Sequence, residues 1–270
     1  EVIHAHGALT FLQIAHGGRR TSSRIMGHRP LAPSEVPMPG STETPRALTE
    51  EEIAQVIKSF GMAARRAQEA GFDGVELHGT HGYLISQFIS PHTNQRRDLY
   101  GGDLSRRMNF ALEVLQEVRS VVGPNFVIGF RLTGDEYLED GVTSALAVEA
   151  AKILEEAGIH YISVSAGSGE PGLGASSSHP CYVPPGQLVH LAEKVQKAVK
   201  IPVAAVGSLA DPETAEQVLA EGKASIVAIA RGFIAEPHWA RKALKNEHSA
   251  IRTCIRCNEC LGNIRKFREI

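Results

Sequence analysis

Three titratable side chains, His78, His81 and Tyr83, stand within six residues of one another, with two glycines between them. Neutral imidazole N–H groups can donate hydrogen bonds to a carbonyl or nitro oxygen that gains negative charge during a reaction. A phenol one turn further along can deliver a proton. The spacing therefore predicts a site that polarises a substrate oxygen and protonates a neighbouring atom. A pair of solvated loop histidines also fits the spacing, as does a zinc site, although the H-E-x-x-H pattern is missing.

A second group of candidate residues lies near the C-terminus, where Cys254, Cys257 and Cys260 form a C-x-x-C-x-x-C run. This spacing suits thiolate ligation of a metal or an iron–sulfur cluster. Three reduced thiols in a terminal segment are the alternative interpretation. Disulfide frameworks are normally denser and occur in short secreted chains. A cubane cluster usually takes four thiolates, and the fourth cysteine, Cys181, lies far upstream.

The composition excludes several classes of protein. The chain has 270 residues, with 28 Lys and Arg against 30 Asp and Glu, so charge gives no basis for binding nucleic acid or an anionic membrane. The longest apolar runs, such as residues 226–230, are far shorter than the roughly 20 residues that span a bilayer. The N-terminus shows no basic-then-apolar export signal. We therefore expect a cytoplasmic protein that acts on a small molecule.

Apolar runs alternate with amphipathic segments along the chain. The helix predicted at residues 49–70 begins with Thr49 and Glu52 in a T-x-x-E capping box and ends at Gly71. The predicted strands are residues 8–14, 74–78, 126–132, 161–165, 203–206 and 226–230. The other predicted helices are residues 106–122, 144–157, 187–199, 212–221 and 237–246. Residues 21–46, rich in Pro and Ser, are expected to form an active-site loop.

Six consecutive βα units predict a parallel sheet covered by helices. An open sheet that binds a dinucleotide would show G-x-G-x-x-G after its first strand, and no strand here is followed by that motif. Polar groups instead follow several strands, as is usual in a barrel. These residues are Gln13, His16, His78, Arg131, Ser165, Gly207 and Arg231. We therefore predict an α/β fold, a (β/α)8 TIM barrel of which six βα units (strands 3–8) are visible.

Residues 78–107, HGTHGYLISQFISPHTNQRRDLYGGDLSRR, resemble the signature segment of the Old Yellow Enzyme family of FMN-dependent ene-reductases. The resemblance extends over nearly the whole chain. Residues 9–19, 129–137, 202–208 and 226–233 resemble the third, fifth, seventh and eighth strands of the family's barrel. It implies an NADH- or NADPH-dependent flavin oxidoreductase that binds FMN and reduces the activated C=C bond of α,β-unsaturated carbonyl compounds.

The resemblance also implies roles for single residues around the flavin. Gln13 would bond the pyrimidine edge, and Arg131 would sit by N1, where a guanidinium offsets the negative charge of the reduced ring. Gly207, Ala230 and Arg231 would hold the phosphate, and this fold usually binds phosphate after strands seven and eight. A salt-bridged barrel arginine at Arg131 and an ordinary surface charge at Arg231 are the alternatives.

The resemblance implies that His78 and His81 bind the substrate's oxygen and that Tyr83 donates a proton to the alkene α-carbon. It also implies that hydride passes from flavin N5 to the β-carbon. Two alternatives stay open. An amine dehydrogenase on the same scaffold would enclose a cation among aromatic rings, but aromatic residues are only 6% of the sequence. A non-catalytic fragment that has lost flavin is the other. We expect His179 and Cys181 to be exposed to solvent, with lining of the substrate pocket as the alternative for both.

Both ends of the chain depart from the simple ene-reductases. The sequence opens at what resembles the third strand, and the Cys run resembles a subgroup that includes trimethylamine dehydrogenase, 2,4-dienoyl-CoA reductase and 2-enoate reductase. That subgroup implies a 4Fe–4S cluster on Cys254, Cys257 and Cys260, with a fourth ligand beyond Ile270. We expect part of a longer protein, for which a homo-oligomer is one compatible state. Residues 1–247 would form the FMN-binding barrel and residues 248–270 a Cys-rich segment.

Overall fold

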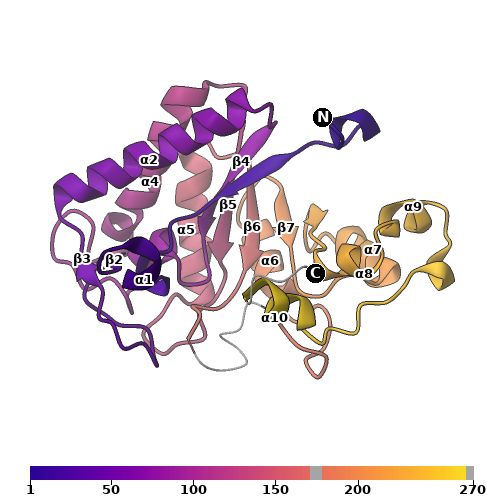
Figure 1. The fold of residues 1–270 in the computed structure, drawn as a ribbon. Coiled ribbons are helices and arrows are strands. Elements are labelled where there is room, and N and C mark those ends of the chain that lie inside the picture. The colour runs from indigo at the N-terminus through magenta and orange to yellow at the C-terminus, as the bar shows by residue number, and fades with distance from the viewer. Residues whose placement is uncertain (171–177, 266–270) are drawn as a thin grey trace.

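Six strands form one parallel sheet in the computed structural model, which describes residues 1–170 and 178–265. Each strand pairs with the next large strand along the chain, in the order β1-β4-β5-β6-β7-β8 (Figure 1). Their bounds are Phe11–Ile14, Gly74–Gly79, Val127–Thr133, Tyr161–Ser165, Val203–Ala205 and Ile226–Val227. This sequential order is that of consecutive units in a (β/α)8 barrel. The α/β fold is confirmed, although β1 and β8 do not pair within the described residues.

Helices connect successive strands and cover the sheet. They are α2 (Glu50–Glu69), α4 (Leu104–Val122), α5 (Ser144–Glu156), α6 (Val189–Gln196) and α7 (Pro212–Ala220). The predicted capping box starts α2: Thr49 accepts from the Glu52 amide, and the Glu52 carboxylate accepts from the Thr49 amide. No helix within the described ranges is long and apolar enough to cross a membrane.

The two faces of the sheet differ in polarity because side chains alternate along each strand. Leu77, Phe130 and Ile162 lie in the same buried apolar cluster as Ile53 of α2 and Phe110 of α4. The opposite face is polar. The strand register aligns Gln13 with Glu76, His78 with Arg131, and Arg131 with Ser163. The polar face is therefore where candidate chemical groups from different strands meet.

Several short elements differ from the expected pattern. The predicted loop at residues 21–46 contains α1 (Ser23–Met26) and β2 (Leu31–Ala32), which pairs with β3 (Arg46–Ala47). All six residues of helix α3 (Leu84–Ile89) are buried, the polar Ser86 and Gln87 among them, so the helix lacks the exposed polar face of a surface helix. The last strand ends at Val227 instead of Ala230, α8 (Arg231–Ala235) follows it, and α9 spans only Trp239–Leu244. The remaining elements are η1 (His4–His6), η2 (Gly18–Arg20), η3 (His248–Ala250) and α10 (Glu259–Arg265).

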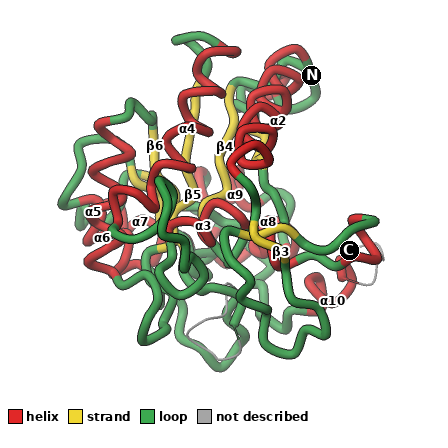
Figure 2. Tube along the Cα trace, turned by 90° about the vertical axis from the view of Figure 1, so that its left-hand side faces the viewer, coloured by secondary structure: helices red, strands yellow, loops and turns green. Residues whose placement is uncertain are grey.

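Long loops gather toward one end of the sheet. Figure 2 shows long loop segments collected on the side of the sheet where α3 and β3 lie. The carboxyl ends of parallel strands share one edge, so loops far apart in sequence become neighbours there. The last five residues of the predicted Cys-rich segment, 266–270, lie outside the described residues.

Candidate active site

The structure brings together the three side chains predicted to contact substrate. His78 is near the end of β4, and its ring centroid lies 5.2 Å from that of His81 and 4.9 Å from that of Tyr83. The chain turns sharply between them, with a φ of 59° at His81 and 70° at Gly82. A Cβ on Gly82 would come within 1.9 Å of the Ser168 carbonyl oxygen, so this turn requires glycine.

Both histidines are held in the neutral form. Burial, with smaller contributions from Arg131 and Arg20, lowers the pKa of His78 to about 4. Burial likewise holds the pKa of His81 well below its ordinary value. The His81 Nε2 atom lies 2.7 Å from Ser165 Oγ, whereas both ring nitrogens of His78 lack a hydrogen-bond partner among the described residues. Because a buried polar atom is costly without a partner, the His78 ring is poised to bond a ligand.

The low pKa of His78 predicts an acid-sensitive fold. The unfolded chain binds a proton at this residue near pH 6.5, but the folded chain binds it only near pH 4, so stability falls as pH drops between these values. We expect His78 to contribute a loss of about 2 kcal/mol between pH 7 and pH 5. Urea unfolding of the wild type and His78→Gln at both pH values checks this. Equal losses in the two proteins would contradict it.

A cavity of about 550 Å³ lies at the carboxyl ends of the last strands, and none of His78, His81 and Tyr83 lines it. Arg131, which lines the cavity and pairs with His78 in the strand register, connects the two. The lining of the cavity includes four of the residues expected to hold a flavin: Arg131, Gly207, Ala230 and Arg231. The volume lies within the range of small-molecule and cofactor sites. The buried Nε of Arg131 has no hydrogen-bond partner in residues 1–170 and 178–265, so one donor remains for a bound group.

Arg231 is fixed by neutral acceptors around the cavity. It donates to Ser208 Oγ at 3.0 Å, to the His179 carbonyl at 2.9 Å and to the side chain of Asn258. The expectation that His179 is exposed is wrong: the residue is buried and lines the cavity, and burial lowers its pKa. Cys181 is exposed, as expected.

Gln13 occupies a different place from the other predicted flavin ligands. It lies on β1, at the edge of the sheet, and its Nε2 donates to Glu76 Oε1 at 2.6 Å. Glu76 also accepts from the Tyr161 hydroxyl at 3.2 Å. Gln13 therefore shares the polar face with His78 and Arg131 but is absent from the lining of the cavity.

The cysteine run lies at the rim of the same cavity. Cys254 and Cys260 line it, and Cys257 is exposed. Asn258 and Arg256 fix the run to the loop after β6, through the carbonyls of Ser178 and Cys181, each at 3.0 Å. No group of three or more potential ligands that could hold a metal ion occurs in the described part of the chain. Cluster ligation by these thiols therefore stays a prediction.

Two residues near the cluster received no role from the sequence. The strand pattern placed Ser165 at the end of a strand, where β6 has it. Its contact with His81 could not be predicted, because the two residues are 84 positions apart. Arg20 follows the H-G-G motif after β1, and its Cζ lies 5.0 Å from the centroid of the Tyr83 ring. Charge alone could not have separated it from Arg19.

Comparison with characterised proteins adds close relatives. The chain is 46% identical over 269 residues to an NADH oxidase from Thermoanaerobacter brockii, covering 97% of this chain and 40% of that protein. It is 34% identical over 290 residues to a cinnamate reductase from Clostridium sporogenes, covering 100% of this chain and 43% of the relative. The chain thus spans about two fifths of the length of these relatives.

Solved structures that resemble this chain include two oxidoreductases. A 2-naphthoyl-CoA reductase superposes with a TM-score of 0.89 at 32% identity, over 95% of this chain and 41% of that one. Histamine dehydrogenase from Rhizobium sp. 4-9 also gives 0.89, at 29% identity, over 97% and 38%. The family model for NADH:flavin oxidoreductases and NADH oxidases matches residues 1–249. The chain therefore belongs to the NADH:flavin oxidoreductase / NADH oxidase family of enzymes.

Proposed function

We propose that this chain is the FMN-binding part of an NADH- or NADPH-dependent ene-reductase that acts on α,β-unsaturated carbonyl compounds. The observation that carries the proposal is the cluster of His78, His81 and Tyr83. Two neutral imidazoles there stand beside a phenol, and one imidazole has both nitrogens without partners among the described residues. This set can polarise a carbonyl oxygen and protonate the adjacent carbon.

The residues of the cavity fit FMN. Arg131 has a buried Nε that no described residue bonds. Gly207 adopts a φ of 126°, which favours glycine, and without a side chain its backbone can approach a ligand closely. Arg131 would lie by the ring, and Gly207, Ala230 and Arg231 would hold the phosphate. Gln13 would bind the pyrimidine edge of the flavin, and its hydrogen bond to Glu76 would have to break for this. When bound, FMN supplies the hydride for the β-carbon.

The chain's own groups then complete the addition. His78 donates a hydrogen bond to the substrate oxygen as negative charge builds there, and its neutral state avoids a competing proton transfer. His81 is oriented by Ser165 for the same oxygen. Tyr83 delivers the proton to the α-carbon, and its ring contact with His78 keeps its position fixed.

Amine oxidation is less well supported by this site. A protonated amine would meet the guanidinium groups of Arg20 and Arg131, whose charges both depress the pKa of His78. Within the described residues, Tyr83 is the one Phe, Tyr or Trp ring that packs against this histidine pair, and it contacts His78, whereas a cation site uses several aromatic faces.

We also propose that Cys254, Cys257 and Cys260 ligate a 4Fe–4S cluster. Their spacing supports this, as does the position of two of them on the lining of the cavity. Among the described residues the thiols do not yet form a metal-ligating group. A cytoplasmic location is proposed with it, because the four cysteines are free and reducing compartments keep thiols reduced.

The test is a visible absorption spectrum of anaerobically purified protein, with iron and acid-labile sulfide assays on the same sample. We expect a flavin band and a broad iron–sulfur shoulder. Cys257→Ser should lose iron, and Cys181→Ser, at an exposed cysteine outside the run, should retain it. Flavin without iron would contradict the cluster, and a sample without flavin would contradict FMN binding. Reduction of 2-cyclohexenone by NADH or NADPH then tests the ene-reductase activity.

A further inference from the structure

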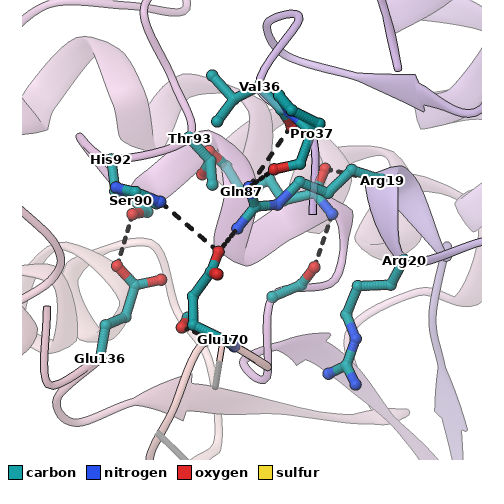
Figure 3. A network of polar contacts seen from close by, with 12 residues as sticks. Arg19, Arg20, Val36, Pro37, Gln87, Ser90, His92, Thr93, Glu136 and Glu170 are labelled. Carbon is teal, nitrogen blue, oxygen red and sulfur yellow. Dashed lines mark hydrogen bonds and ion pairs between the residues drawn. The ribbon is translucent and has the colours of Figure 1, made fainter. Parts of the chain in front are cut away.

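Two consecutive arginines after β1, Arg19 and Arg20, differ in whether a carboxylate lies beside them. Arg19 is buried, forms an ion pair with the buried Glu170 and donates to the Pro37 carbonyl at 3.0 Å. Arg20 belongs to none of the ion pairs among the described residues. Figure 3 shows the Arg19 side chain entering the network around Glu170, whereas Arg20 points away from it. Within the described residues, no carboxylate therefore neutralises the charge of Arg20.

The guanidinium of Arg20 is instead fixed against the proton donor. Its Cζ lies 5.0 Å from the centroid of the Tyr83 ring, within the range of a cation–π contact, and its Nη1 donates to the His81 carbonyl. Gly169 covers the same guanidinium from the loop after β6. A Cβ there would come within 2.7 Å of Cζ and Nη1, so glycine lets the loop pack closely on the charge.

A fixed cation at this position acts on the charge that the proposed reaction creates. After hydride has reached the β-carbon, the α-carbon takes the proton of Tyr83. The O–H bond breaks, its electron pair stays on the phenol oxygen, and a C–H bond forms. Tyr83 thereby changes from a neutral phenol to a phenolate, which later recovers a proton from solvent. A guanidinium over the ring attracts the phenolate more strongly than the phenol, so it favours the transition state over the ground state.

We propose that Arg20 is a positioning residue for proton transfer, whose uncompensated charge stabilises the phenolate that forms on Tyr83. The inference rests on the proposed function, because it requires Tyr83 to be the proton donor. The neighbouring cation, Arg131, lies on β5 and lines the cavity. Arg20, by contrast, contacts the donor's ring directly.

A double-mutant cycle between Arg20 and Tyr83 tests this on the flavin-loaded protein. The rate measured is that of reoxidation of the reduced protein by 2-cyclohexenone under anaerobic conditions. We expect Arg20→Gln to slow this step roughly tenfold in the wild type but less than twofold in a Tyr83→Phe background. The solvent kinetic isotope effect should rise in Arg20→Gln, because proton transfer becomes more rate-limiting. Arg20→Lys, which keeps the charge, should restore most of the rate.

Controls separate this role from a structural one. Reduction of the flavin by NADH or NADPH should be unchanged in Arg20→Gln, and Arg24→Gln, at an exposed arginine of the same segment, should match the wild type in both steps. Equal slowing by Arg20→Gln in both backgrounds would overturn the inference and leave the proposed function intact. A Tyr83→Phe protein as fast as the wild type would overturn the proposed proton donor itself. If Arg20→Gln slowed the reaction with crotonate but not with methyl crotonate, Arg20 would recognise the substrate carboxylate, and the inference about Arg20 would be overturned.

Discussion

Replacing Tyr83 by phenylalanine is expected to slow alkene reduction by about 10²- to 10⁴-fold, the usual contribution of a positioned general acid. The change removes one oxygen and keeps the ring, so the edge contact with His78, at 4.9 Å between centroids, should persist. Stopped-flow reoxidation of the reduced flavin by 2-cyclohexenone measures the affected step. Only the proton delivery to the α-carbon should change.

The half-reactions supply the internal control for this prediction. Reduction of the flavin by NADH or NADPH needs no proton from Tyr83 and should proceed at the wild-type rate. Tyr182→Phe, at a tyrosine that is 70% exposed, should leave both half-reactions unchanged. Slowing of both half-reactions to the same extent by Tyr83→Phe would refute the proton-donor role and indicate a distorted site.

Replacing Glu170 by alanine is expected to destabilise the fold by about 3–5 kcal/mol, because it leaves the Arg19 guanidinium buried without its counter-charge. The side chains of Arg19 and Glu170 are 1% and 5% exposed, so solvent cannot compensate the loss. The pair joins the segment after β1 to the loop after β6, and His92 Nε2 lies 3.6 Å from the same carboxylate (Figure 3). Urea unfolding at pH 7 measures the change.

A surface ion pair provides the matched control. Arg65 and Glu69 pair at 2.9 Å on α2, but their side chains are 66% and 60% exposed. Glu69→Ala should therefore cost less than about 0.5 kcal/mol. Replacing both buried partners, as Arg19→Met with Glu170→Leu, should recover much of the stability lost in Glu170→Ala. Equal costs for the Glu170 and Glu69 variants would show that the buried pair is not the link between these loops.

Patterns within single segments predicted the fold well. The alternation of apolar runs and amphipathic helices is a local property, and it gave the strands, their parallel order and the helix that starts at Thr49. Errors appeared where local patterns are weak. All residues of helix α3 are buried, the polar Ser86 and Gln87 among them, so its sequence lacks the pattern of a surface helix, and the last strand ends at Val227, before its apolar run does.

The candidate site divides in the same way. His78, His81 and Tyr83 were identifiable because they are neighbours in sequence, and the chain between them turns through positive φ angles at His81 and Gly82. Gly207 and Arg231 were assigned to one place from the fold's usual geometry, and both line the cavity. The exposure expected for His179 was wrong, because burial of a loop residue depends on what packs over it.

The sequence by itself determined the type of fold, the family resemblance and the chemical character of the central cluster. The tertiary structure alone decided which charges are neutralised and which remain available. Arg19 and Arg20 are adjacent and chemically identical, yet Arg19 meets Glu170 across 151 positions and Arg20 meets the Tyr83 ring. The physical reason is that electrostatic energy depends on distance and burial in space, and the parallel strands bring the ends of distant segments to one edge of the sheet.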